Sequence, residues 1–286
     1  MAVAYLNGGW LPRAEARISV DDRGFLLGDG VFETGRLHAG RFFRLEQHLR
    51  RLAGSGELLR LEVPPLEDLV AIANGLVSRN DFSEASLRIT ITRGQGGRGL
   101  SRRGAGPSTI LATLAPIPAD WRERAARGWT LRTASIRRPS TTSVPAQLKG
   151  LGRVYGLLAH FEAEDAGFDD ALMLSADGFV AEGPTWNLFW RTGQTLFTPA
   201  LTAGILEGVT RSLIMELASR RGFSVEEVLW GRDRLDRVDE LFATMTSNGV
   251  VPITRLDSRI FSEPSAANDL QDSYWQLVRS ELGQKE

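Results

Sequence analysis

The stretch GVFETGRLHAGRFFRLEQHLRRLAGSGELL, from Gly30 to Leu59, predicts two strands followed by a helix. Gly30–Leu37 and Arg41–Arg44 are the predicted strands, and a short turn separates them. Apolar residues then recur every three or four positions across Leu45–Leu59, which is the spacing of one helix face. The stretch therefore mixes the two kinds of element, as an α+β fold does.

The rest of the chain continues this mixture and divides into two halves. The further predicted elements are a hairpin over Ala4–Pro12, strands over Ser86–Arg93, Ser108–Leu114 and Trp129–Ile136, and helices over Leu66–Val77, Val154–Ala166 and Leu206–Arg221. The segment Ala115–Gly128 carries two prolines and a run of charges, which is typical of a connection. We therefore expect a small α+β domain over residues 1–117 and a larger domain over 118–286, with a linker near 115–128.

Composition excludes several classes of protein. The chain has 286 residues, of which 42% are hydrophobic and 24% charged, as in ordinary globular proteins. The absence of cysteine excludes disulfides, thiolate metal sites and thiol catalysis. A net charge of -1, with arginine pairs such as Arg50-Arg51 and Arg137-Arg138 scattered along the chain, argues against nucleic-acid binding and predicts solvated faces for most pairs. No apolar stretch predicts a membrane span or a signal peptide, so we expect a cytoplasmic enzyme.

Two candidate sites carry weak signals. The three histidines lack any paired metal-ligand spacing, so no metal site is predicted. Gly94–Gly99 matches the GxGxxG pattern, but no helix can follow it, so a dinucleotide site is disfavoured. The better interpretation is a flexible glycine-rich loop that presents Arg98.

Lysine is almost absent from this chain. Of 34 lysine and arginine residues, only Lys149 and Lys285 are lysines. Arginine keeps its proton in proteins and cannot act as an amine nucleophile, whereas lysine can. Lys149 is therefore either a leftover of codon bias or a residue retained for its amine.

Two further features favour the second reading. Gly204–Arg211 leads two glycines into a helix with Thr210 in its first turn, and exposed N–H groups there suit a phosphate. Glu182 closes a predicted hairpin strand and is by itself an ordinary surface candidate. An amine, a phosphate anchor and an acid for the ring nitrogen are together what pyridoxal phosphate requires.

The sequence at this point strongly resembles the class IV, or fold type IV, pyridoxal-phosphate aminotransferases. The resemblance runs in order along almost the whole chain, through DRGFLLGDGVFET (22–34), FRLEQHLRRL (43–52), Gln147–Lys149, AEGPTWNLF (181–189), Phe197–Pro199, Gly204–Arg211 and Thr246–Ile253. It implies a small N-terminal α+β domain, a larger pseudo-barrel domain and a homodimer with shared active sites. Its partners would be a small-molecule amino donor and a keto-acid acceptor.

The resemblance also assigns roles to residues. Lys149 is the implied catalytic Schiff-base lysine, Arg51 binds the phosphate and Glu182 binds the pyridine nitrogen. Val209 and Thr210 are expected at the phosphate, with Thr246 or Ser247 nearby. The implied substrate residues are Phe32, Arg98 and Arg153.

The substrate is less determined than the cofactor. Gly28-Asp29-Gly30 with Phe32 is similar to the D-amino-acid and lyase groups, and Arg98 stands where D-amino-acid enzymes often hold an arginine. Leu100 replaces the histidine that usually follows, and Arg93–Gly99 is similar to the pattern of aminodeoxychorismate lyase. We expect an aminotransferase that favours D-amino acids or uses a primary amine. The alternatives are aminodeoxychorismate lyase, which eliminates pyruvate, and a branched-chain amino acid aminotransferase.

Overall fold

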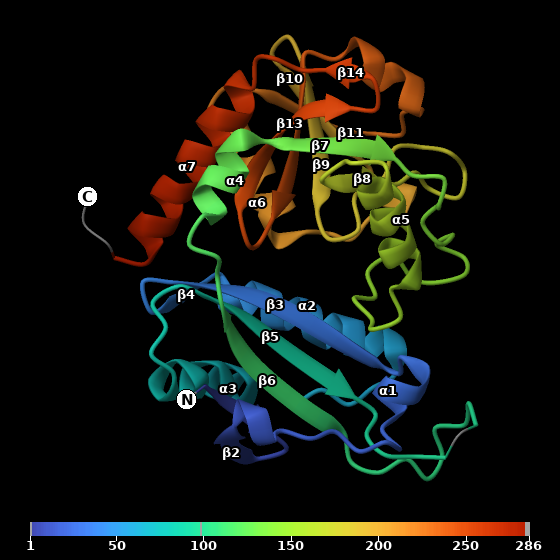
Figure 1. The fold of residues 1–286 in the computed structure, drawn as a ribbon, viewed down its shortest axis with the longest axis vertical. Coiled ribbons are helices and arrows are strands. Elements are labelled where there is room, and N and C mark those ends of the chain that lie inside the picture. The colour runs from blue at the N-terminus through green and yellow to red at the C-terminus, as the bar shows by residue number, and fades with distance from the viewer. Residues whose placement is uncertain (1, 98, 284–286) are drawn as a thin grey trace. The chain divides into compact units, whose positions relative to one another are not determined.

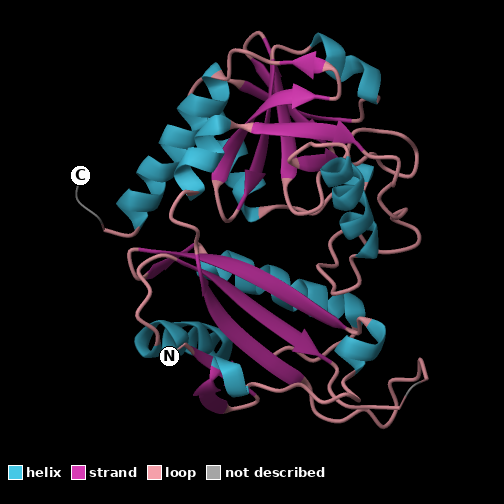
Figure 2. Ribbon diagram, in the orientation of Figure 1, coloured by secondary structure: helices cyan, strands magenta, loops and turns pink. Residues whose placement is uncertain are grey.

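The computed structural model describes residues 2–97 and 99–283 and has the expected α+β architecture (Figures 1 and 2). The chain forms two compact units. The first unit consists of the residues up to Pro118 together with Gln147–Gly152, and the second consists of Ala119–Ala146 and Arg153 onward. The segment that contains Lys149 thus folds with the first unit, whereas the expected division at 117/118 placed it in the second domain.

The first unit is a six-stranded antiparallel sheet in the order β2-β1-β6-β5-β3-β4. Its elements are β1 (Val3–Leu6), β2 (Gly9–Pro12), a 3-10 turn (Arg13–Glu15), α1 (Arg23–Leu27), β3 (Gly30–His38), β4 (Arg41–Phe43), α2 (Leu45–Leu59), α3 (Leu66–Arg79), β5 (Ala85–Thr92) and β6 (Thr109–Pro116). Asn7 and Gly8, both with positive φ, make the tight turn of the β1–β2 hairpin.

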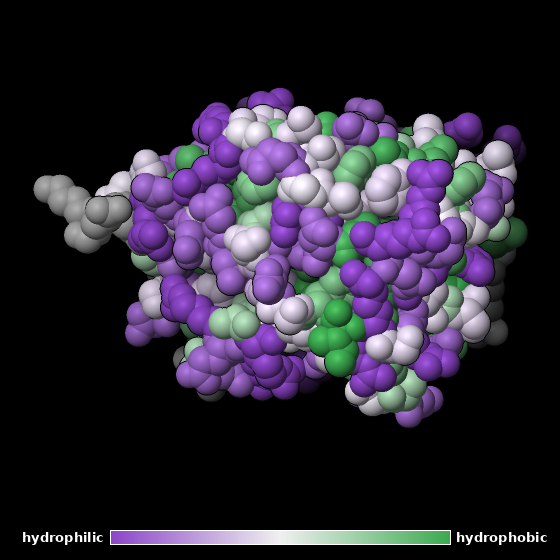
Figure 3. All heavy atoms as spheres, turned by 90° about the horizontal axis from the view of Figure 1, so that it is seen from above, coloured by the Kyte–Doolittle hydropathy of each residue, from purple (hydrophilic) through white to green (hydrophobic). Residues whose placement is uncertain are grey.

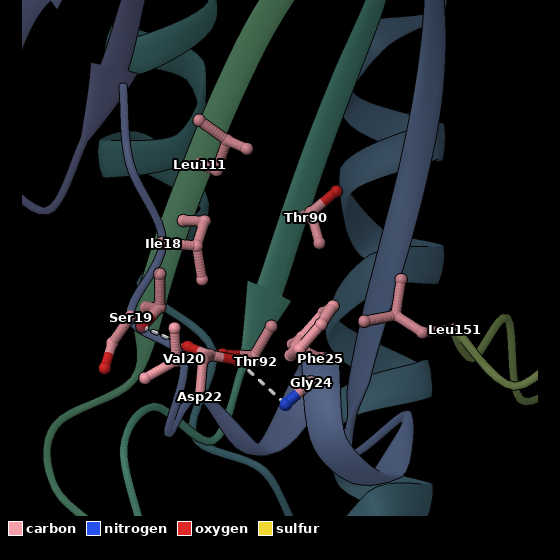
Figure 4. A pocket seen from close by; sticks show the side chains of 11 residues that line it. Ile18, Ser19, Val20, Asp22, Gly24, Phe25, Thr90, Thr92, Leu111 and Leu151 are labelled. Carbon is pink, nitrogen blue, oxygen red and sulfur yellow. Dashed lines mark hydrogen bonds between the residues drawn. The ribbon is translucent and has the colours of Figure 1, made fainter. Parts of the chain in front are cut away.

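One face of this sheet packs against α2 and α3. Alternate strand residues such as Ile89 and Ile91 of β5 form a core with Leu49 and Leu52 of α2 and with the apolar face of α3. On β5 the intervening residues Thr90 and Thr92 lie on the opposite face. There they line a pocket of about 330 Å³ together with side chains of the loop before α1 (Figure 4).

The second unit is a mixed eight-stranded sheet in the order β11-β10-β9-β12-β13-β7-β8, with β14 paired to β13. Its elements are α4 (Trp121–Arg127), β7 (Trp129–Thr133), α5 (Val154–Asp165), β8 (Asp170–Leu172), β9 (Asn187–Thr192), β10 (Thr195–Pro199), a 3-10 turn (Leu201–Ala203), α6 (Val209–Arg220), β11 (Ser224–Val228), a 3-10 turn (Arg232–Arg237), β12 (Glu240–Met245), β13 (Gly249–Leu256), β14 (Arg259–Ile260) and α7 (Ser265–Glu281). Leu188 and Trp190 of β9 lie in its main core with Leu241 and Ala243 of β12.

Three details differ from the expectations. The segment 115–128 is not wholly a linker, because it contains the short helix α4, whose residues Trp121 and Ala125 are buried. The helix expected from Leu206 begins at Val209, because Gly208 is its extended N-cap residue. In the Arg137-Arg138 pair only Arg137 is exposed, and Arg138 is buried.

The surface agrees with the composition. The face shown in Figure 3 is mostly hydrophilic, and its hydrophobic side chains form small groups. Among the described residues no helix combines the length and the apolar character that crossing a membrane requires.

Candidate active site

Lys149 is held by its backbone beside β3 and α2 of the first unit. Its carbonyl accepts a hydrogen bond from the Phe32 amide at 3.1 Å, and its own amide donates to the Ser55 hydroxyl at 3.1 Å. The next residue, Gly150, forms a β-bridge with Val31. These contacts hold the backbone of Lys149 against β3 and α2, and its side chain is buried.

The amine of Lys149 meets a buried carboxylate, Glu33. Lys149 Nζ lies 2.5 Å from Glu33 Oε1. Arg51 donates two hydrogen bonds of 2.8 Å to the same carboxylate, from Nε and from Nη2. Burial alone would raise the pKa of Glu33, but the charges of Arg51 and Lys149 hold it well below its usual range. The carboxylate thus brings together the two first-unit residues predicted for the cofactor.

His48 completes this cluster. Its Nδ1 lies 3.4 Å from Glu33 Oε1, and burial lowers the pKa of the imidazole despite the neighbouring carboxylate. A neutral histidine therefore adds no charge to a cluster that already contains two cations.

Glu33 was missed by the sequence analysis, although a signal exists. Side chains alternate along a strand, so Glu33 of β3 lies on the same face as the core residues Val31 and Leu37. An acidic residue at a core position requires a cationic partner in contact with it. Arg51, on the helix that covers this face, is such a partner.

Glu182 has a corresponding set of partners in the second unit. Its Oε2 accepts hydrogen bonds from Asn187 Nδ2 at 2.8 Å and from the Leu206 amide at 3.1 Å. Its Oε1 lies 2.5 Å from Nη1 of Arg138. The carboxylate is therefore buried, paired with a cation and oriented by three partners.

The turn that carries Glu182 is tightly constrained. The Gly183 amide donates to the Trp186 carbonyl at 3.0 Å, and a β-carbon at Gly183 would lie 1.9 Å from the Trp186 ring. The Trp186 indole in turn donates to buried Asp170 at 2.7 Å. Only glycine fits under this ring, which explains why Gly183 follows Glu182 in the sequence.

The helix α6 begins with the predicted phosphate residues. Val209 and Thr210 are its first two residues, and its N-cap residue, Gly208, supplies no side-chain acceptor to the first-turn amides. A β-carbon on Gly208 would lie 2.0 Å from Asn187 Oδ1. Thr246 and Ser247 lie in the same unit, in the turn between β12 and β13.

The predicted substrate residues have distinct positions. Phe32 is buried in the first unit, with Lys149 Nζ 5.4 Å and the Arg88 guanidinium 3.9 Å from its ring centroid. Arg153 is half-buried in the second unit, where it precedes α5 and its Nη2 donates to the Pro184 carbonyl of the Glu182 turn. Arg98 lies outside the described residues.

These side chains fit pyridoxal phosphate. Each unit, taken by itself, contains groups that this cofactor uses: the first has a buried amine and a guanidinium, and the second has an arginine-paired carboxylate and a helix whose N-cap residue makes no side-chain hydrogen bond. Within the described part of the chain no group of three histidine, aspartate or glutamate side chains is placed to hold a metal ion.

Comparison with known proteins agrees with this chemistry. A putative branched-chain-amino-acid aminotransferase of Methanocaldococcus jannaschii is 34% identical over 90% of this chain and 89% of its own length. A D-alanine aminotransferase of Bacillus licheniformis is 29% identical over 88% of both chains, and an aminodeoxychorismate lyase of Bacillus subtilis is 29% identical over 98% of this chain and 96% of its own.

Solved structures and a family model extend the comparison. A branched-chain aminotransferase of Thermoproteus uzoniensis, solved with norvaline, has a TM-score of 0.92 and 28% identity, covering 99% of this chain and 96% of its own. An aminotransferase of Brucella abortus, solved with bound pyridoxal phosphate, has a TM-score of 0.88 and 26% identity, covering 96% of this chain and 98% of its own. The family model for amino-transferase class IV matches residues 30–256. The resemblance found in the sequence is thereby confirmed: the chain belongs to the class IV aminotransferases and is a pyridoxal-phosphate-dependent transaminase.

Proposed function

We propose that Lys149 is the residue that attaches the cofactor and moves the proton at the substrate α-carbon. The observation that carries this proposal is the buried cluster in which Lys149 and Arg51 share the Glu33 carboxylate. A buried primary amine beside a carboxylate can be held in a fixed orientation and can accept or return a proton. When bound, pyridoxal phosphate supplies the electron sink and carries the amino group between donor and acceptor.

The other residues bind and orient. Arg51 offers the positive charge of its guanidinium to the phosphate, and the first-turn amides of α6 with Val209 and Thr210 add N–H donors and the positive end of a helix dipole. Thr246 and Ser247 are proposed as further polar contacts to the phosphate. Glu182 accepts the hydrogen bond of the ring nitrogen.

Borohydride reduction tests the attachment site directly. Reduction of the holoenzyme should add the mass of the pyridoxyl phosphate group to one peptide, the one that contains Lys149, and Lys149→Ala should remove the label. The control is Lys285→Ala, which should keep it. A label on any other peptide contradicts the proposal.

For the donor we propose a branched-chain L-amino acid. The support is the 34% identical relative and the Thermoproteus uzoniensis structure, both of which are branched-chain enzymes by name. The D-amino-acid preference expected from Gly28–Gly30 and Phe32 is the second candidate, supported by the D-alanine aminotransferase relative. Arg98 and Arg153 are the proposed carboxylate contacts for either donor.

A donor panel separates these possibilities. L-leucine, D-alanine, an (R)-amine and aminodeoxychorismate are each mixed with the holoenzyme, and the cofactor spectrum is followed in a single turnover. Conversion fastest with L-leucine supports the first proposal, and fastest with D-alanine supports the second. Pyruvate released from aminodeoxychorismate without a keto-acid acceptor identifies a lyase instead.

We further propose that the enzyme is a homodimer. Helix α5 exposes an apolar stripe at i, i+3, i+4 and i+7, formed by Val154 (65% exposed), Leu157 (55%), Leu158 (48%) and Phe161 (48%). In the first unit Val20 and Phe25, each 75% exposed, flank the pocket of Figure 4. A second copy that covers such surfaces would remove them from water. Light scattering should give twice the mass of the chain, and Leu157→Glu with Phe161→Glu should give the single mass.

A further inference from the structure

Arg138 forms a buried ion pair with the carboxylate that we assign to the ring nitrogen. Arg138 Nη1 lies 2.5 Å from Glu182 Oε1, and the side chains are only 6% and 5% exposed. Both residues belong to the second unit, so the pair is internal to one compact body. A charge pair so deeply removed from water has to be held in good geometry to be tolerated.

The arginine is anchored on all sides. Its Nε donates to the Gly204 carbonyl at 2.8 Å, and its backbone amide donates to the Leu174 carbonyl at 2.9 Å. The guanidinium carbon lies 5.6 Å from the ring centroid of Tyr155. The cation is thus a fixed part of the fold, and its position does not depend on solvent or on a mobile loop.

Glu182 also receives two neutral donors, Asn187 Nδ2 and the Leu206 amide, both on Oε2. Neutral donors orient a carboxylate and favour its ionised form, but they carry no net charge to oppose the effect of burial, which favours the protonated form. A cation in direct contact reverses that preference, because it stabilises the ionised form strongly where the dielectric is low. The charge of Arg138 therefore stabilises ionised Glu182 more strongly than either neutral donor, Asn187 or Leu206, does.

A proton that lies between Glu182 and a pyridine nitrogen has two places to reside. It can stay on nitrogen, opposite a carboxylate, or it can move to a Glu182 oxygen and leave the nitrogen with its lone pair; no other bond changes. The electron sink needs the first arrangement, since the protonated ring draws electrons more strongly. A buried carboxylate without a counter-charge would favour the second.

We propose that Arg138 is a positioning residue that keeps this proton on the ring nitrogen by holding Glu182 as a carboxylate. The inference rests on the proposed role of Glu182 and goes beyond it, because it assigns the charge state of the ring to a residue that acts only through Glu182. The neighbouring arginine, Arg137, is exposed and provides a matched control.

The test is the ¹⁵N resonance of holoenzyme loaded with pyridoxal phosphate labelled at the ring nitrogen, because protonated and unprotonated pyridine nitrogens resonate far apart. We expect the protonated position in the wild type and in Arg137→Gln. In Arg138→Gln the resonance should move toward the unprotonated position, and the first half-reaction should slow at least tenfold. Arg138→Lys, which retains a charge, should keep the protonated position.

The outcomes separate this inference from the assignment of Glu182. Glu182→Gln should move the resonance if Glu182 contacts the nitrogen, and an unmoved resonance there removes that assignment. A resonance that moves in Glu182→Gln but not in Arg138→Gln overturns the role of Arg138 alone, as does an unprotonated wild type. If Arg138→Gln shows no cooperative thermal unfolding, Arg138→Lys becomes the deciding variant: a folded, loaded Lys variant with a protonated nitrogen supports the charge argument, and one with an unprotonated nitrogen contradicts it.

Discussion

Lys149 and Arg51 meet on a single buried carboxylate, with Lys149 Nζ at 2.5 Å from Glu33 Oε1 and Arg51 bonded to both oxygens. One anion thus faces two cations inside the first unit. The balance of charge at this point sets how the protein responds to mutation and to acid.

Glu33→Gln should lower the free energy of unfolding by about 3 kcal/mol at neutral pH, because it leaves buried Lys149 and partly buried Arg51 without their anion. The pKa of Glu33 is held below its ordinary value of 4.5, so its stabilising effect is complete above that pH and is lost as the pH falls through the lower, folded-state value. The difference between wild type and variant should therefore shrink below pH 4.5. Urea unfolding at a series of pH values measures it, and a constant difference down to pH 2 would contradict the assignment.

His48 should give a second, separate pH dependence. Burial lowers the pKa of His48 below the ordinary 6.5. Below pH 6.5 the imidazole is therefore protonated more in the unfolded chain than in the folded one, and the free energy of unfolding falls as the pH drops. His48→Gln should flatten the stability profile between pH 7 and pH 5. His160, whose side chain is 41% exposed, provides the control variant His160→Gln. If the free energy of unfolding has the same slope against pH in wild type and His48→Gln, the pKa of His48 does not differ between the folded and unfolded states, which contradicts the prediction.

Arg50 and Arg51 are adjacent and should behave differently. Arg51→Ala removes the bidentate partner of Glu33 and should cost about 3 kcal/mol of stability and weaken cofactor retention. Arg50 makes an exposed pair with Glu46 on the helix surface, and Arg50→Ala should cost less than about 0.5 kcal/mol. Equilibrium dialysis of the cofactor and thermal unfolding measure the two effects. Equal behaviour of the two variants would contradict the importance assigned to the ion pair between Arg51 and Glu33.

Two glycines should respond to alanine in opposite directions. A β-carbon at Gly208 would lie 2.0 Å from Asn187 Oδ1, so Gly208→Ala should cost about 1–3 kcal/mol and disturb a donor to Glu182. At Gly54, inside α2, a β-carbon meets nothing within 4 Å. Gly54→Ala should therefore stabilise the protein by about 0.5–1 kcal/mol through helix propensity. Thermal unfolding of both variants is the measurement, and stabilisation by Gly208→Ala would show that the α6 start can shift.

The sequence was informative where the signal is local. Helical spacing located α2 and α3, and the hairpin predicted over Ala4–Pro12 is formed by β1 and β2, because these elements depend on neighbours in the chain. Arg138 was not distinguished from Arg137, since which of two adjacent arginines is buried depends on a carboxylate 44 positions away, Glu182. The alternation of β3 marks Glu33 as a buried acid, but its contact with Lys149 could not be predicted, because the two residues are 116 positions apart.

The return of Gln147–Gly152 to the first unit limits how this protein can be divided. The amides of Phe32 and Leu151 close hydrogen bonds between that segment and β3. A gene fragment encoding residues 1–118 would lack this partner along β3 and would contain no lysine at all. We therefore expect that split-protein complementation with a break near 118 requires the second fragment to insert a short peptide into the first.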